Sequence, residues 1–545
     1  MNYDTFMFRH KGVPVMPVGV QVHNSSANRV NELERAFAVA KICHCNSIAI
    51  PVYWEKIESE EGKFELDDVG ELIRMARKHD LYLFILWFGT WKNGCMKYVP
   101  EWVKINKEKY HRVIAKDGTI LPVISPLCQN TLQADRKAFC KLIKYIKNID
   151  EEENTVLAVQ IENEPGILTG AVRDYSLMAE NEFNAPVPED FCANMKQHPD
   201  SNLSRFWKEK GEKRENWKKA FGENAAEYYT AYKLAGYIEN IASSGKKIYD
   251  LPMYVNVQVE LCKWKIPGYN YPSGGAVEKV YDLWKWYAPS LDLLAPDIYL
   301  WDYKSYDKCC ESYAKGDNAL FVPESGPNES NSRYLFEAVG KYRAIGYFLF
   351  GAEGILDEKD SLDPEFNHIA GSLQALAAIA PVWNQYRGIK RIGVVNQMEY
   401  MAIQRLEFTD YIGFVSFTYG QPEAGDNDND WNWQDHKHRK YREEQKTCGK
   451  RGRGMIIETD QNEFLVLGDA YRVVFVSRKT LEDGLPCNLT SEYLLCRSVA
   501  YLSVEEGIYE KSGEFQIKRR RNGDESDFGI WVQPDVGVVK VRLDS

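Results

Sequence analysis

The chain has 545 residues and a formal net charge of −11, and 44% of its residues are hydrophobic. This length exceeds what a single hydrophobic core usually supports, so two or three domains are expected. The negative charge argues against nucleic acid and anionic membranes as partners, and the absence of a long apolar run or a signal-like start predicts a cytoplasmic protein without a membrane segment.

The first 386 residues alternate short apolar runs with amphipathic patterns of helical period. Eight runs have the length and the β-branched content of buried strands: residues 15–21, 47–53, 81–87, 156–161, 253–257, 291–298, 319–323 and 345–350. A helical pattern follows each run in turn: residues 31–44, 66–79, 135–147, 225–242, 276–287, 306–314, 333–342 and 370–386. Eight βα repeats predict a (β/α)8 TIM barrel, whose active site lies at the C-terminal ends of the strands.

An open, doubly wound sheet is the alternative architecture for this region. That fold would be expected to carry a Gly-rich phosphate-binding turn after its first strand, and Gly19 to Ser26 does not provide one. Two connections in the barrel are unusually long, residues 88–133 and 165–224. Long loops in a compact domain are usually functional, so we expect both to form walls around the catalytic rim.

After Tyr386 the helical stripes give way to short alternating runs that are typical of β-strands: residues 464–467, 471–476, 515–517 and 537–541. They predict a C-terminal β-sandwich-like domain over residues 387–545. Within it, Asn522-Gly523 between apolar flanks indicates a β-hairpin.

A polar insertion near residues 425–453 interrupts the C-terminal domain. The alternating spacing of Asp426, Asp428 and Asp430 is compatible with a calcium loop. However, the segment lacks the bidentate Glu that an EF-hand loop requires. We therefore favour a solvated loop over a calcium site.

Two carboxylic acids follow strands that lie across the mouth of the predicted barrel. Asn163 and Glu164 end the fourth strand, beside a low-dielectric interior that can raise a carboxyl pKa. Glu324 ends the seventh strand in the equivalent position. Either Glu alone could be a first-turn helix residue or an ion-pair partner. Two of them facing one pocket, roughly 5–5.5 Å apart, would form the carboxyl pair of a retaining glycosidase.

In this context the sequence resembles the clan A glycoside hydrolases, and within them family 35, the β-galactosidases. The motifs that carry the resemblance are Gln160 to Pro165, Tyr53 to Phe64, Trp87 to Gly94 and Tyr98 to Val103. The last two are similar to a bacterial subgroup with an added C-terminal β domain. The resemblance spans roughly residues 8–385 and, more loosely, the remainder of the chain.

The resemblance implies a hydrolase that removes a terminal β-linked sugar, with β-D-galactose as the first expectation. The long connections 88–133 and 165–224 predict exo action, and the closeness of the two strand-end carboxyl groups predicts a retaining mechanism. The resemblance makes Glu164 the acid/base and Glu324 the nucleophile, and it places Asn163 at the sugar 2-hydroxyl and Tyr299 near the nucleophile. No metal or organic cofactor is required by this chemistry. One departure concerns the sugar: where better-known members have Gly-Pro-Tyr and a sugar-binding Glu after the third strand, this chain has Phe88-Gly-Thr-Trp91.

Further candidates for sugar contacts lie at or near the predicted strand ends. These residues are His23, Trp54, Trp87, Trp91, Lys92, Asn256 and Phe350. Trp91 and His23 are the strongest of them, because aromatic stacking and a titratable donor suit a polyol ring, although each could instead belong to the core.

Two rival functions are compatible with the same pattern. An endo-acting mannanase or cellulase of clan A would keep both Glu residues but would need an open groove. A non-catalytic carbohydrate-binding barrel would keep the aromatic residues without a need for opposed carboxyl groups. The expected partner is a carbohydrate in each case, and a homo-oligomer remains open.

Overall fold

The structure, a computed structural model, describes residues 6–28, 30–259, 265–389, 391–398, 401, 403–417, 451–482, 499–526 and 529–544. The acidic segment Asp426 to Asp430, for which a solvated loop is expected, lies outside the described residues, as does most of the polar insertion. Among the helices of the described part, none has both the length and the apolar character needed to cross a bilayer.

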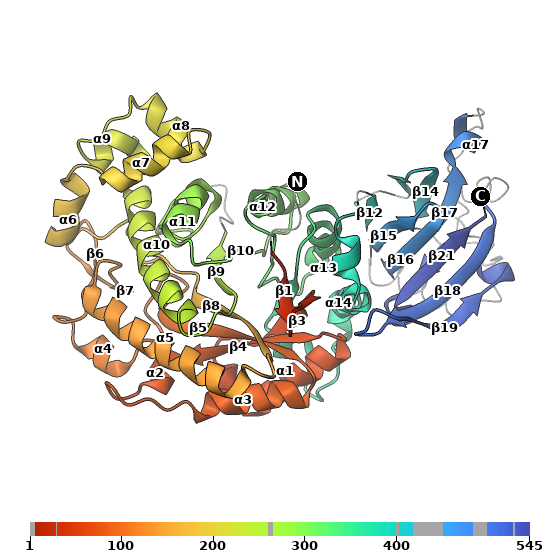
Figure 1. Ribbon diagram of the computed structural model, residues 1–545, viewed down its shortest axis with the longest axis horizontal. Coiled ribbons are helices and arrows are strands. Elements are labelled where there is room, and N and C mark those ends of the chain that lie inside the picture. The colour runs from red at the N-terminus through yellow and green to blue at the C-terminus, as the bar shows by residue number, and fades with distance from the viewer. Residues whose placement is uncertain are drawn as a thin grey trace.

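A curled parallel sheet forms the centre of the N-terminal part of the chain (Figure 1). Its seven strands are ordered β10-β9-β8-β5-β4-β3-β11. Their bounds are β3 (Val18–Gln21), β4 (Ser47–Tyr53), β5 (Tyr82–Lys92), β8 (Val156–Asn163), β9 (Met253–Gln258), β10 (Leu293–Asp297) and β11 (Tyr347–Phe350). Every neighbouring pair in the sheet is parallel.

The predicted seventh strand, residues 319–323, does not form a continuous ladder. Instead Val322 makes an isolated parallel bridge to Tyr347, and Ser325 makes one to Ile298. Pro323 has no N–H to donate, which limits ladder formation in this segment. The two bridges nevertheless fill the gap between β10 and β11, so the predicted (β/α)8 barrel is confirmed.

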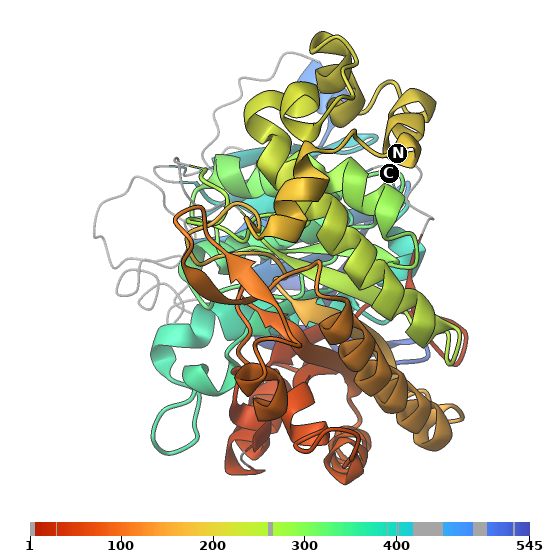
Figure 2. The same ribbon diagram turned by 90° about the vertical axis from the view of Figure 1, so that its left-hand side faces the viewer.

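Helices cover the outside of the barrel and overlap the predicted ones. They are α1 (Val30–Ile42), α3 (Asp67–Lys78), α5 (Gln129–Asp150), α10 (Ala225–Lys246), α11 (Tyr281–Tyr287), α12 (Tyr303–Tyr313), α13 (Glu329–Phe336) and α14 (Asn367–Ile379). The long helices α5 and α10 pack side by side (Figures 1 and 2). The predicted helix 370–386 is divided, because Pro381 follows α14 and a separate short helix, α15 (Trp383–Tyr386), comes after it.

The two long connections carry structure of their own. β5 continues to Lys92, so the first connection begins later than predicted, and it contains α4 (Glu101–Ile105), β6 (Arg112–Ile114) and β7 (Ile120–Ile124). The second holds a group of four short helices, at the upper left in Figure 1. They are α6 (Leu177–Asn184), α7 (Glu189–Gln197), α8 (Asn202–Glu209) and α9 (Trp217–Phe221).

Two antiparallel sheets form the C-terminal part of the chain. The larger sheet is ordered β12-β15-β16-β21-β18-β19 and the smaller one β13-β14-β17-β20. The bounds are β12 (Ile392–Asn396), β13 (Ile403–Glu407), β14 (Tyr411–Ser416), β15 (Arg453–Asp460), β16 (Glu463–Asp469), β17 (Tyr471–Ser477), β18 (Tyr501–Tyr509), β19 (Phe515–Arg521), β20 (Ile530–Val532) and β21 (Val538–Leu543). Val473 and Phe475 from the smaller sheet share a core with Phe464 and Val466 from the larger one, which confirms a β-sandwich.

The predicted hairpin at Asn522-Gly523 is wrong. β19 pairs with β18 in the larger sheet, whereas β20 pairs with β17 in the smaller one. The dipeptide instead begins a 3₁₀ turn, Gly523–Glu525, in the connection between the two sheets. β20 crosses over because its three residues are all buried in the core that the two sheets share.

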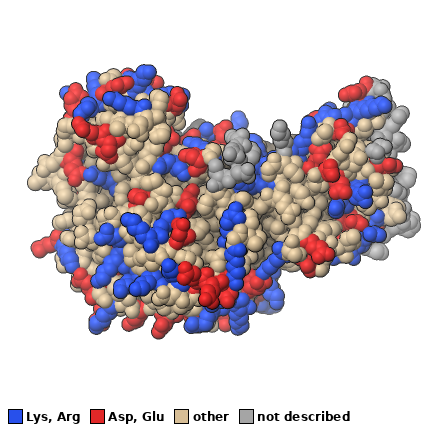
Figure 3. Space-filling model, viewed as in Figure 1, with Lys and Arg blue, Asp and Glu red and all other residues tan. Residues whose placement is uncertain are grey.

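The outer face of the larger sheet packs against the barrel. Met455 and Leu467 of this sheet belong to the same core as Leu373 and Leu376 of α14. Basic and acidic side chains are interspersed over the face of the molecule shown in Figure 3. Among the described residues on that face, neither charge forms an extended patch.

Candidate active site

The C-terminal end of β8 has an unusual backbone. Glu162 has a φ of 61° and Glu164 a φ of 45°, in the left-handed region that non-glycine residues rarely adopt. Such a conformation costs on the order of 1–3 kcal/mol per residue and persists where the surroundings enforce it. Here Asn93 and Gly94 donate backbone hydrogen bonds to the carbonyl groups of Asn163 and Glu164. The β5 extension thus fixes the strand end that carries both polar side chains.

Glu324 is held by side chains from several strands of the barrel. Its Oε1 atom accepts hydrogen bonds from Gln21 Nε2 at 2.7 Å, Asn163 Nδ2 at 3.3 Å and Asn256 Nδ2 at 3.5 Å. Its Oε2 atom accepts one from the Tyr299 hydroxyl at 2.9 Å. The carboxylate is 4% exposed, so these donors determine its orientation rather than bulk water.

Glu164 has a different electrostatic environment. Burial, and then the negative charge of Glu324, raise the pKa of the Glu164 carboxyl to about 7. The charge of Lys92 and hydrogen bonds with Asp297 and Asn93 act in the opposite direction but do not cancel the increase. The two carboxyl groups therefore differ in their surroundings. Hydrogen-bond donors surround Glu324, whereas Glu164 keeps its proton up to about neutral pH.

Asn256 connects the two acids. Its Oδ1 atom accepts a hydrogen bond from the backbone N–H of Glu164 at 2.8 Å, while its Nδ2 atom reaches Glu324 and also donates to Asp297 Oδ2 at 2.7 Å. Lys92 completes the group, because its Nζ atom donates to Asn163 Oδ1 at 2.7 Å. The structure thus brings together five residues that the sequence singled out and one that it did not: Asn163, Glu164, Glu324, Lys92, Asn256 and Asp297.

The sequence reasoning missed Asp297, Gln21 and Asn93. Asp297 is fully buried, and burial together with the charges of Glu324 and Glu164 raises its pKa well above the ordinary value of an Asp. This favours the protonated acid, which can donate its hydrogen bond to Glu164. Asp297 and Gln21 each end a parallel strand, as Asn163 does, so the rule that found Glu164 could have found both.

Tyr299, His23 and Phe350 lie on one side of this group. Burial, and then the charge of Glu324, raise the pKa of Tyr299 well above its usual range, so the phenol remains a donor. The ring of Phe350 contacts Tyr299 at 6.4 Å and His23 at 5.3 Å between ring centroids. The His23 side chain is exposed, and its backbone N–H donates to Glu353 Oε2 at 3.2 Å.

The three tryptophans proposed as sugar contacts lie elsewhere. Trp54 is fully buried and donates to Glu58 Oε2, Trp87 donates to Asp135 Oδ1, and the ring of Trp91 packs edge-on against Tyr237. All three belong to the core between the sheet and the helices. The reason is strand alternation: Phe84, Leu86 and Phe88 of β5 fill the barrel interior, so Trp87 points to the opposite face.

A buried acid pair explains why β5 extends to Lys92. Glu162 Oε2 accepts the backbone N–H of Trp91 at 2.7 Å, and Asp135 accepts Trp87 Nε1 at 2.8 Å and the Thr90 hydroxyl at 2.6 Å. Burial is the largest cause that raises the pKa of both acids, and they are hydrogen-bonded to each other. The pair anchors the segment from which Lys92 and Asn93 reach Asn163 and Glu164.

No cluster of three or more His, Cys, Asp or Glu side chains arranged to hold a metal ion occurs in the part of the chain that the structure describes.

Comparison with protein families gives a match to a domain of unknown function (DUF5597) over residues 369–533. This range includes most of α14 and most of the C-terminal sandwich. No curated protein matches the sequence.

Among solved structures, the chain is similar to the catalytic domain of β-amylase from Paenibacillus polymyxa, at 14% identity and a TM-score of 0.48, over 66% of this chain and 98% of that one. It is similar to a family 42 β-galactosidase from G. stearothermophilus, at 12% identity and a TM-score of 0.45, over 67% of this chain and 57% of that one. The β-galactosidase from the Antarctic haloarchaeon Halorubrum lacusprofundi matches at 15% identity and a TM-score of 0.45, over 66% and 58% respectively. The match thus spans somewhat more than half the length of these two β-galactosidases.

Proposed function

We propose that this protein is a retaining glycoside hydrolase, with Glu164 as acid/base and Glu324 as nucleophile. The observation that carries the proposal is the pair of buried Glu residues at the barrel mouth, where Asn256 binds both the backbone N–H of Glu164 and the carboxyl group of Glu324. The raised pKa of Glu164 suits a general acid, and the hydrogen-bond donors around Glu324 suit a fixed nucleophile.

The chemistry follows from these positions. Glu324, oriented by Tyr299 and Gln21, attacks the anomeric carbon and forms a glycosyl ester. Glu164 gives its proton to the leaving oxygen, and the bond to the aglycone breaks. In the second step Glu164 takes a proton from water, which attacks the anomeric carbon and releases Glu324 and a sugar of the original anomeric configuration.

For the substrate we propose a terminal β-linked sugar, with β-D-galactose first. The resemblance of Gln160 to Pro165 and of Tyr53 to Phe64 to family 35 supports this choice. Exo action is supported by the segments 93–128 and 165–224, which add helices and a small sheet after β5 and β8. Release of mixed oligosaccharides from a polysaccharide before any monosaccharide would instead indicate an endo-acting enzyme.

A panel of nitrophenyl glycosides tests the activity, and a 2-deoxy-2-fluoro glycoside of the best sugar tests the assignment. We expect the fluoro sugar to leave its mass on the peptide that contains Glu324, and azide to rescue Glu324→Gly with formation of a glycosyl azide of inverted configuration. Glu58→Gln is the matched control, because Glu58 is 2% exposed but binds Trp54 in the core. No turnover of any glycoside, or label on another residue, would contradict the proposal.

A further inference from the structure

The segment that follows Glu324 is attached to α14. Pro327, three residues after Glu324, accepts a hydrogen bond through its carbonyl group from His368 Nε2 at 3.1 Å. His368 lies in the first turn of α14, and its ring is partly buried. A histidine of a helix packed on the C-terminal sandwich thus holds the backbone of the segment that carries the proposed nucleophile.

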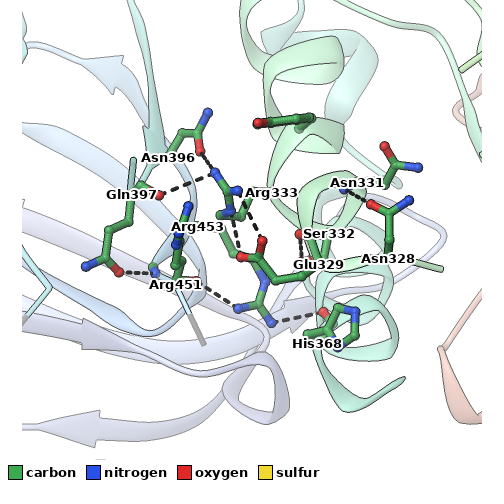
Figure 4. Close-up of polar contacts among 12 residues, drawn as sticks. Asn328, Glu329, Asn331, Ser332, Arg333, His368, Asn396, Gln397, Arg451 and Arg453 are labelled. Carbon is green, nitrogen blue, oxygen red and sulfur yellow. Dashed lines mark hydrogen bonds and ion pairs between the residues drawn. The ribbon is translucent and has the colours of Figure 1, made fainter. Parts of the chain in front are cut away.

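Arg453 of β15 holds this histidine from the sandwich side (Figure 4). Its Nη2 atom donates to the backbone carbonyl of His368 at 2.9 Å, and its Nε atom donates to the Ser372 hydroxyl at 2.7 Å. The guanidinium is also paired with Asp469 of β16 at 2.6 Å. Arg453 is 1% exposed, so these contacts are made without competition from water.

A second connection runs through α13, which begins at Glu329. Arg333 is paired with Glu329 and donates through Nη1 to Asn396 Oδ1 at 2.8 Å, where Asn396 is the last residue of β12 (Figure 4). Asn396 in turn donates to Glu337 Oε1 at 3.0 Å. Arg333 and Asn396 are both buried, at 2% and 4% exposed. Hydrogen bonds therefore connect α13, the helix that follows the proposed nucleophile, to β12, the first strand of the sandwich.

Asn331 joins these contacts to the catalytic group. Its Nδ2 atom donates to the carbonyl of Gly326 at 3.2 Å and to that of Ile298 at 3.4 Å. The backbone N–H of Ile298 donates to the carbonyl of Glu324 at 2.9 Å. Ile298 lies between Asp297 and Tyr299. A shift of the segment that follows Glu324 would therefore move the Glu324 carboxyl relative to the Tyr299 hydroxyl, which donates a hydrogen bond to it.

We infer that the C-terminal sandwich positions the nucleophile of the barrel, through Arg453, His368 and Pro327 and through Asn396 and Arg333. The inference rests on the proposed function and gives the domain of unknown function a role in it. Glu324 lies between two isolated bridges rather than in a continuous ladder, so side-chain contacts add to the few backbone hydrogen bonds that position its segment. A displacement of about 1 Å in a reacting group can cost on the order of 100-fold in rate.

The test compares variants that remove or keep the donor to Pro327. In the full-length protein, His368→Leu should slow covalent labelling of Glu324 by the 2-deoxy-2-fluoro glycoside by about 10- to 100-fold, and should lower kcat more than it raises KM. His368→Gln places an amide N–H near the position of Nε2 and should label within about 3-fold of wild type. The measurement is made well below the melting temperature of each variant.

A matched control separates positioning from stability. Arg521 is buried in the same sandwich, where it pairs with Glu506 of β18 and donates to the backbone carbonyl of Trp531 in β20. Arg521→Met should lower the melting temperature but leave the labelling rate unchanged. If His368→Leu does not fold, Asn396→Ala provides the same test through the second connection.

The outcomes are distinct. Labelling of His368→Leu or Asn396→Ala at the wild-type rate overturns the inference, and so does equal slowing in Arg521→Met at an equal loss of melting temperature. A wild-type protein that neither turns over a glycoside nor becomes labelled refutes the proposed function itself.

Discussion

Glu164→Gln should stabilise the folded protein above pH 7 while it removes acid catalysis. Burial and the charge of Glu324 raise the pKa of Glu164 from 4.5 to about 7. The folded state therefore binds this proton more tightly than the unfolded chain does, so the free energy of unfolding falls as the pH rises from 4.5 to about 7 and changes little beyond that. At about 1.4 kcal/mol per pKa unit, the ionised carboxyl costs about 3 kcal/mol at pH 8.

Gln does not titrate, so it avoids this cost. Urea unfolding of wild type and Glu164→Gln at pH 5 and pH 8 gives a stability difference at each pH. We expect the advantage of the variant to be larger at pH 8 by about 2–3 kcal/mol, because most of the wild-type loss occurs between these two pH values. The environment assigned to Glu164 would be refuted if the stability difference between the variant and wild type were the same at both pH values, or were smaller at pH 8.

The same carboxyl should set the alkaline limb of activity. On a substrate with a poor leaving group, kcat/KM of the wild type should fall about tenfold per pH unit above about 7, as Glu164 loses its proton. Glu164→Gln should lose roughly 10²–10⁴-fold on that substrate and much less on a nitrophenyl glycoside, whose leaving group departs without a proton. Equal losses on both substrates would count against the acid role.

Three further variants test neighbouring residues. Lys92→Met removes a positive charge that lowers the pKa of Glu164, so the alkaline limb should move up by on the order of 1 pH unit, and a pH profile of kcat/KM that stays in place would contradict the assignment. Tyr299→Phe removes the 2.9 Å donor to Glu324 and should slow covalent labelling by about tenfold or more, whereas an unchanged labelling rate would exclude this role. Trp54→Phe should lower the free energy of unfolding by about 1–3 kcal/mol and leave KM unchanged, because Trp54 lies in the core; a raised KM would restore it as a sugar contact.

Much of the fold could be predicted from the sequence, because hydrophobic period is a local property. The alternation of apolar runs and helical stripes determined the barrel, and the switch to short alternating strands after Tyr386 determined the sandwich. The polar residues that end an apolar run also made Asn163, Glu164 and Glu324 candidates, because polar residues at strand ends meet at the mouth of a barrel. The signal was present for Asp297 and Gln21 as well.

Only the tertiary structure decided which side of a strand each residue occupies and which strands pair. Trp87, Trp91 and Lys92 all belong to β5. The two tryptophans face the helices, whereas Lys92 reaches Asn163, because the pleat and the register of a strand set the direction of each side chain. Asn522-Gly523 is a dipeptide typical of hairpin turns, but β19 before it and β20 after it pair in different sheets. The contacts from Arg453 to the Glu324 segment join residues far apart in the chain, and no local pattern records which distant surfaces will meet.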